Sequence, residues 1–203
     1  MDITKKGYYF LGLIIGLFIW VIILYFLGPP GDDVFDIFIR LGVLIGYTAM
    51  FVAALIIPFM KEVTKMFGTS FLKIHHLLSV IGIILITAHP IAMAINWETL
   101  SVFLPEFSDW FTFWQNSGRL AFYIIYFAAI IGLVRKYMTP KIWRFLHGFI
   151  YIALLFGYFH GLFSGTDFQE NFGVMITFTA MLVLIFEVLI YRRYQKYKLK
   201  QKT

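Results

Sequence analysis

The sequence predicts an all-α membrane protein, a bundle of six transmembrane helices that forms a single domain over residues 1–203. Composition predicts the membrane, because 61% of the residues are hydrophobic and 14% are charged, against roughly 25% charged in a soluble domain. The apolar residues also gather in blocks near the roughly 20 residues that a helix needs to cross the hydrocarbon. Helices are expected because lipid offers the backbone no hydrogen-bond partners. The six blocks are residues 8–28, 37–60, 74–96, 119–138, 145–163 and 172–191.

The first block follows Lys5 and Lys6 and could be taken for a secretion signal. It runs on for about 20 residues, however, and ends at "GPPGDD" without a small-x-small cleavage pattern. We therefore expect it to remain as a helix. No Gly/Ser-rich linker, low-complexity tract or repeat marks a second domain. The longest connection, residues 97–116, is so aromatic that part of it is expected to form a short helix in the membrane interface.

The basic residues predict the orientation of the chain. If the N-terminus is cytoplasmic, every Lys and Arg except Arg40 and Arg119 falls in an inner segment, and most acidic residues fall in outer ones. Because short cytoplasmic loops carry the excess of Lys and Arg, both termini are expected inside. The net charge of +6 is spread between apolar blocks, which favours a membrane surface as partner and no nucleic acid. A multi-pass protein of a bacterial or archaeal plasma membrane is expected.

All five histidines fall in the third and fifth blocks, where ionisable side chains predict function. His75 and His89 are 14 residues apart and His147 and His160 are 13 apart, which gives separations of about 21 and 20 Å along two helices. The two helices run in the same direction, so His75 can face His147 at an inner level, and His89 can face His160 at an outer level. Two facing imidazoles suit the axial positions of a haem iron. The sequence therefore predicts two b-type haems between the third and fifth helices.

The helical rotation fits one helix better than the other. Fourteen residues return a helix to within about 40° of the same face, but thirteen miss by about 140°. Local overwinding, a bend near Gly148 or Gly157, or different ring approaches to the two haems would reconcile His147 with His160. His76 is a second candidate for the inner ligand, although His75 is preferred.

Other metal chemistry is disfavoured. The chain has no cysteine, which excludes disulfides, thiolate metal sites, cysteine-bound iron–sulfur clusters and covalently attached c-type haem. The two histidine levels are too far apart for one zinc or copper ion, and neither shows a third clear donor. Arg119 and Arg144 begin the fourth and fifth blocks at the depths where haem carboxylates would emerge, and arginine can bind a carboxylate bidentately. Snorkelling or topology signalling is the alternative role for Arg144.

The stretches "IHHLLSVIGIILITAH" and "SGRLAFYIIYFAAIIGLVRKYMTPKIWRFLHGFIYIALLFGYFHGL" resemble the ferric reductase-like transmembrane domain. This haem-only core is related to ferric reductases, NADPH oxidases and the membrane haem subunit of the bacterial methionine sulfoxide reductase system. The resemblance covers about residues 37–191, with the histidine spacings and the W-x-x-L-H entry from Trp143 to His147 as its most specific parts. It implies an electron path from a reduced flavin inside, through the haems, to an acceptor outside.

The chain departs from fused members of that family because it has no Gly-rich phosphate loop and no nucleotide domain after the sixth block. A cytoplasmic flavin reductase or free reduced flavin is therefore the expected donor, so any flavin would come from a partner. The outer acceptor is expected to be ferric iron, oxygen or an extracytoplasmic partner protein. The basic tail could dock a donor, although binding to anionic lipid is favoured. Two alternatives stay open: a haem subunit of a reductase such as a sulfoxide reductase, and a non-redox transporter with histidine proton relays.

Overall fold

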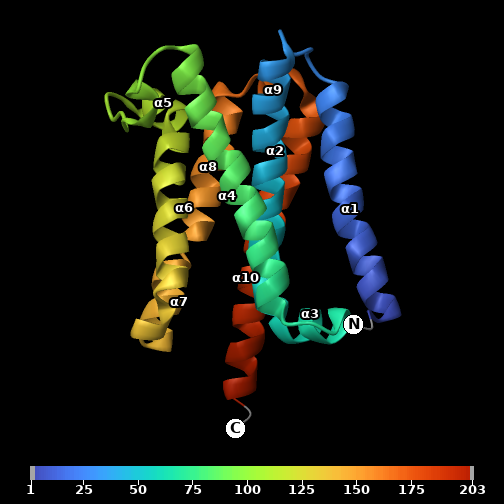
Figure 1. The fold of residues 1–203 in the computed structure, drawn as a ribbon. Helices are drawn as coiled ribbons and strands as arrows, with labels where there is room; N and C mark the ends of the chain where they lie inside the picture. Colours follow the sequence, from blue (N-terminus) through green and yellow to red (C-terminus); the bar gives the residue numbers. More distant parts are fainter. Residues whose placement is uncertain (1–2, 202–203) are drawn as a thin grey trace.

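The computed structural model describes residues 3–201, which form helices joined by short loops (Figure 1). The predicted all-α class is confirmed for these residues. Short 3-10 turns lie at Ile57–Phe59, Ser101–Phe103 and Arg135–Tyr137. The helices are α1 (Lys5–Phe26), α2 (Val34–Leu55), α3 (Met60–Phe67), α4 (Phe71–Asn96), α5 (Trp110–Gln115), α6 (Ser117–Leu133), α7 (Pro140–His147), α8 (Ile150–Ser164), α9 (Thr166–Glu170) and α10 (Phe172–Lys200).

Five helical segments are long and apolar enough to cross a membrane: α1, α2 with its extension into α3, α4, α7 with α8, and α10. The predicted block 119–138 becomes α6, which is apolar but has only 17 residues and is about 26 Å long. The first and last described helices, α1 and α10, reach the same end of the bundle, which we call the terminal end and which also holds α3 and α7 (Figure 1). The opposite end, called the far end, holds α5 and α9.

Two boundaries differ from the predicted blocks. The block 37–60 stops being one helix at Leu55, and the chain turns into α3, which ends at Gly68 in the left-handed conformation (φ 60°) that glycine adopts readily. The last helix continues well past residue 191 through most of the basic tail. The predicted short helix within 97–116 is confirmed as α5, which is capped by Asp109. A hydrogen bond from the Thr112 hydroxyl helps to hold the pKa of the Asp109 carboxyl below its ordinary value.

The outer surface of the bundle is apolar. Large side chains such as Leu13, Ile84 and Ile130 are more than half exposed, and they belong to three different helices. Monomeric soluble proteins rarely expose contiguous apolar patches of such extent. A lipid bilayer would cover this surface, which makes a multi-pass integral membrane protein the coarse description that fits the chain.

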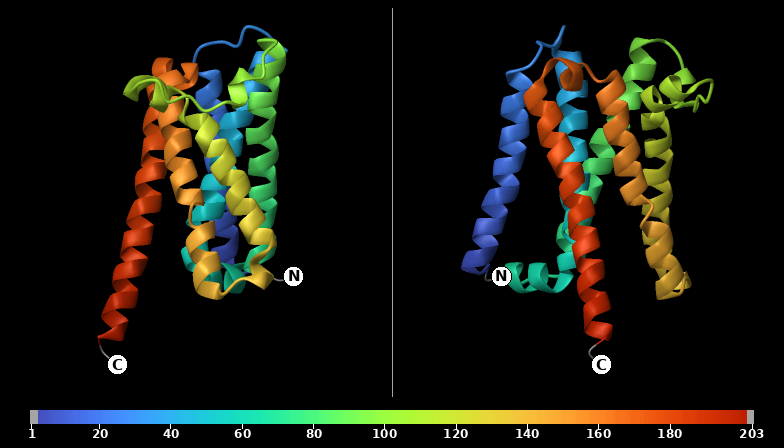
Figure 2. Two further views of the ribbon diagram at one scale, coloured as in Figure 1. Left: turned by 90° about the vertical axis from the view of Figure 1, so that its left-hand side faces the viewer. Right: turned by 180° about the vertical axis from the view of Figure 1, so that it is seen from behind.

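Inside the bundle, α2 packs against α4 and α6 packs against α8 more extensively than any other helices pair (Figure 2). Glycines allow the first pair to approach closely: a Cβ atom at Gly82 of α4 would lie 2.6 Å from Met50 Cγ of α2. Tyr47 of α2 joins the two pairs by donating its hydroxyl to the carbonyl of Leu154 in α8, at 2.9 Å. The histidine-bearing helices α4 and α8 are thus each backed by a partner helix.

A buried ion pair fastens the far end. The Arg40 guanidinium on α2 donates to both carboxylate oxygens of Asp167 on α9, at 2.8 and 3.1 Å, and to Asp36 at 3.0 Å. It also donates to the carbonyls of Pro29 and Pro30 in the loop between α1 and α2. From the sequence, Arg40 was expected only to be a basic residue on the outer side of the membrane. Its contacts give it a structural role, since they tie three segments together.

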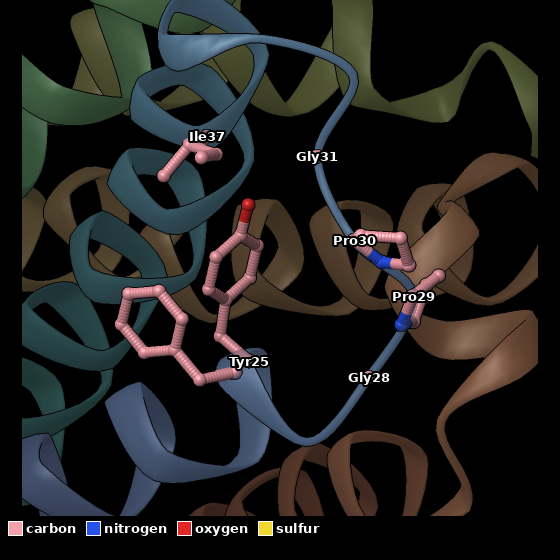
Figure 3. Close-up of a pocket in the computed structure, with 7 residues that line it drawn as sticks. Tyr25, Gly28, Pro29, Pro30, Gly31 and Ile37 are labelled. Carbon is pink, nitrogen blue, oxygen red and sulfur yellow. The ribbon is translucent and has the colours of Figure 1, made fainter.

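The same loop borders a small cavity of about 230 Å³. Figure 3 shows the Tyr25 hydroxyl pointing into the space between Ile37 and the loop. This hydroxyl is buried and has no hydrogen-bond partner among the described residues. The Arg40 guanidinium lies over the Tyr25 ring, 5.4 Å from its centroid, and contributes a cation–π contact.

Candidate functional site

His75 of α4 and His147 at the end of α7 lie side by side near the terminal end, and we call this pair the terminal level. Their ring centroids are 6.2 Å apart and the ring planes are inclined by 69°. Two imidazoles on opposite sides of one metal ion, each at a metal–nitrogen distance of about 2 Å, place their centroids about 6 Å apart. The observed separation therefore fits a pair of axial ligands, although an edge-to-face contact between two rings also falls in this range.

Both rings are held by carbonyl groups of the backing helices. His75 Nδ1 lies 3.1 Å from the Ala53 carbonyl of α2, and His147 Nδ1 lies 2.9 Å from the Ala128 carbonyl of α6. A carbonyl only accepts, so each Nδ1 carries the proton and each Nε2 keeps its lone pair. Histidines that bind metals commonly donate their other ring N–H to such a carbonyl, which orients the ring and raises the basicity of the nitrogen that binds the metal. Both rings therefore present an Nε2 lone pair that could bind a metal.

Aromatic side chains support the same two rings from one helical turn earlier. Phe71 stacks on His75 with centroids 5.5 Å apart and planes 18° apart. Trp143 stacks on His147 at 5.6 Å and 12°. On both sides of the terminal level, an aromatic ring four residues before the histidine therefore stacks on the imidazole and restricts its orientation.

His89 of α4 and His160 of α8 form the second pair, called the far level. His160 Nδ1 donates to the Gln115 carbonyl at the end of α5, which again leaves Nε2 free. Its predicted partner His89 lies in the second half of α4. Its Nδ1 is buried and has no partner among residues 3–201. The far level thus has one ring anchored to a carbonyl and one ring that is not.

Two glycines of α6 support the rings on its side, and the sequence analysis did not single them out. A Cβ atom at Gly118 would collide with the His160 ring, whereas one at Gly132 would lie 3.5 Å from His147 Cε1. These glycines are 14 residues apart, so they share a face of α6. Their spacing equals that of His75 and His89, which is the signal that could have revealed them.

The fifth predicted helix is interrupted at Gly148 and Phe149. The block 145–163 is not one helix: α7 ends at His147, two turn residues follow, and α8 begins at Ile150. This break at Gly148 removes the requirement that 13 residues of regular helix separate aligned ligands. A bend near Gly148 is one of the distortions that the sequence spacing of His147 and His160 suggested.

The remaining candidates are placed less favourably. His76 is exposed on α4, with its ring 5.9 Å from that of His75. Arg119 donates to the Leu104 carbonyl at 2.6 Å and lies 4.0 Å from Glu106. Arg144 is exposed, and its Nε donates to the Pro140 carbonyl in its own helix. The contacts favour His75 over His76, and they leave the roles of both arginines as predictions.

Each histidine level contains a buried nitrogen that has no hydrogen-bond partner among the described residues. Four buried side-chain nitrogens or oxygens have no partner among the described residues: those of Tyr25, His89, Trp143 and Arg192. His89 belongs to the far level and Trp143 to the terminal level. A buried polar group without a partner costs about 1–3 kcal/mol, so an additional bound group with polar atoms would stabilise both levels.

The side chains do not form a site for a bare ion. Across residues 3–201, no three His, Asp or Glu side chains come together in the way that an isolated metal ion needs. Each level instead offers two imidazoles, which suits a metal whose other positions are filled by a macrocycle. In comparisons with known proteins, the chain matches no family model, no curated protein and no solved structure. Function is therefore inferred from this geometry and from the sequence motifs.

Proposed function

We propose that this chain is a di-haem b transmembrane electron carrier, with one haem at each histidine level. The observation that carries the proposal is the terminal level, where the ring centroids of two imidazoles from different helices lie 6.2 Å apart and each imidazole has its Nδ1 bonded to a backbone carbonyl. A lone membrane histidine that only bridges helices needs no such matched pair. The similar sequence spacings, 14 residues from His75 to His89 and 13 residues from His147 to His160, support a second haem at the far level.

The protein's own residues would bind and orient the haems. His75, His147, His89 and His160 would donate Nε2 lone pairs, and the carbonyls of α2, α5 and α6 hold three of these rings in the required tautomer. Bound haem supplies a reversible one-electron couple at each level. The apolar helices exclude water from the region between the levels, which are about 20 Å apart along the helices.

The proposed topology has six spans with both termini in the cytoplasm, in the plasma membrane of a bacterium or archaeon. Shared placement of the two ends supports an even number of spans (Figure 1). α6 is the short sixth span, and its about 26 Å is near the roughly 30 Å of the hydrocarbon. Electrons would enter at the terminal end from a cytoplasmic flavin reductase or reduced flavin, and would leave at the far end to an extracytoplasmic acceptor such as ferric iron, oxygen or a partner reductase.

The proposal is tested with liposomes that hold reduced flavin mononucleotide inside and ferricyanide outside. Liposomes containing the protein should reduce external ferricyanide at least tenfold faster than protein-free liposomes. The His75→Ala variant, inserted at the same density, should fall to the protein-free rate. Equal rates for the native chain and for empty liposomes would contradict the proposed function.

A further inference from the structure

Trp143 and Phe71 occupy equivalent places on the two sides of the terminal level. Each lies four residues before its histidine and stacks on it within 20° of parallel. Four residues of helix place the Cα atom of each aromatic residue about 6 Å nearer the terminal end than the Cα atom of its histidine. Because phenylalanine performs the stacking on α4, the stacking on α7 does not by itself require tryptophan.

Tryptophan adds an indole N–H, which has no hydrogen-bond acceptor in the part of the chain that the structure describes. Trp143 Nε1 is buried and has no acceptor among residues 3–201. The indole nitrogen only donates, so its partner must be a lone pair on another group. Burial of this donor without a partner is unfavourable, and a phenylalanine at this position would avoid it. The donor therefore points to an acceptor that belongs to a bound group.

We propose that Trp143 Nε1 donates a hydrogen bond to a carboxylate of the haem at the terminal level. This inference depends on the proposed function. The only oxygen acceptors on a b-type haem are its two carboxylates, and both extend from one edge of the ring. Trp143 lies beside His147 and nearer the terminal end, where that edge would point out of the membrane.

Trp143 and Arg144 are the two residues of α7 that could contact the haem carboxylates. Arg144 follows Trp143 on α7 but is exposed, and its Nε is bonded within its own helix. An exposed cation screened by water contributes little binding energy, whereas a buried donor to a charged acceptor contributes more. Trp143 is thus the buried carboxylate contact that the sequence analysis, which named Arg144, did not identify.

The experiment compares Trp143→Phe with the native chain, each with the far level emptied by His160→Ala. Each is loaded in detergent with haem b or with an iron porphyrin whose two carboxyl side chains are replaced by ethyl groups. Transfer of the porphyrin to excess apomyoglobin gives the dissociation rate. Trp143→Phe should lose haem b about tenfold faster than the native residue, and both should lose the carboxylate-free porphyrin at the same rate. Trp97→Phe, an exposed tryptophan at the far end, should change neither rate.

Two outcomes would overturn the inference. Equal haem loss with and without the indole would exclude the bond, and an equal increase for both porphyrins would show that Trp143 acts only through packing or a water molecule. If Trp143→Phe fails to fold, ultraviolet resonance Raman spectra of the native chain serve instead, and the indole N–H band should shift between the two porphyrins. An unshifted band contradicts the inference. A chain that binds neither porphyrin contradicts the proposed function itself.

Discussion

Single glycines of α6 decide how closely histidine rings can approach that helix. His160 lies so near Gly118 that one added methyl group cannot fit without displacement of the ring. At Gly132 the same methyl group would make ordinary contact with His147. Two substitutions of the same chemistry on one face of one helix should therefore have different effects on the two levels.

Gly118→Ala should release haem from the far level and leave the terminal level loaded. The reason is steric, because the alanine Cβ occupies the place of the His160 ring. The haem content of the purified variant should be about half that of the native chain. Gly132→Ala is the matched control and should retain full content. If Gly118→Ala also keeps full content, His160 does not need its present position to bind haem.

At the scale of helices and loops, Arg40 holds together the loop after α1, the start of α2, and α9. Its side chain is 15% exposed and that of Asp167 is 8% exposed, so the pair is largely shielded from water. Replacement of Asp167 would remove the more buried of the two carboxylates that pair with Arg40, whereas Asp36 and the carbonyls of Pro29 and Pro30 would remain. The surface pair of Glu62 and Arg192 is 51% and 30% exposed, and it is expected to contribute little.

Asp167→Asn should lower the free energy of unfolding by about 1.5–3 kcal/mol, because Arg40 loses its bidentate carboxylate partner but keeps Asp36. Glu62→Gln, the same change at an exposed pair, should cost about 0–1 kcal/mol. Thermal or chemical unfolding of the two detergent-solubilised variants checks the difference. Equal stabilities would mean that the Arg40 contacts do not stabilise the far end.

Helix boundaries show what the sequence could and could not predict at this scale. Apolar length predicted where the spans lie, because lipid imposes a length on any helix that crosses it. The division between α7 and α8 was not predicted as an end of a helix, since the residues around Gly148 are apolar and aromatic and carry no proline. The contacts of Arg40 were also not predicted: its partner Asp167 is 127 residues away, and hydropathy carries no information about such a pair.

At the scale of the whole molecule, the two helix pairs that pack most extensively are α2 with α4 and α6 with α8. The histidines belong to α4, α7 and α8, and the backbone carbonyls that accept from three of them belong to α2, α5 and α6. The spacing of the histidines predicted the two levels, but the carbonyl partners are backbone atoms and no side-chain pattern reveals them. The sequence also could not predict that His76 would be exposed while His75 bonds to α2.

The most direct measurement is the haem content of the purified chain and of its single histidine variants, grown with ample haem. Two haems per native chain are expected, with a b-type spectrum that shifts on reduction by dithionite. His75→Ala, His89→Ala, His147→Ala and His160→Ala should each lose at least one haem, while His76→Ala should keep both. A colourless native chain, or the same haem content in all four variants as in the native chain, would contradict haem ligation between α4 and the α7–α8 segment.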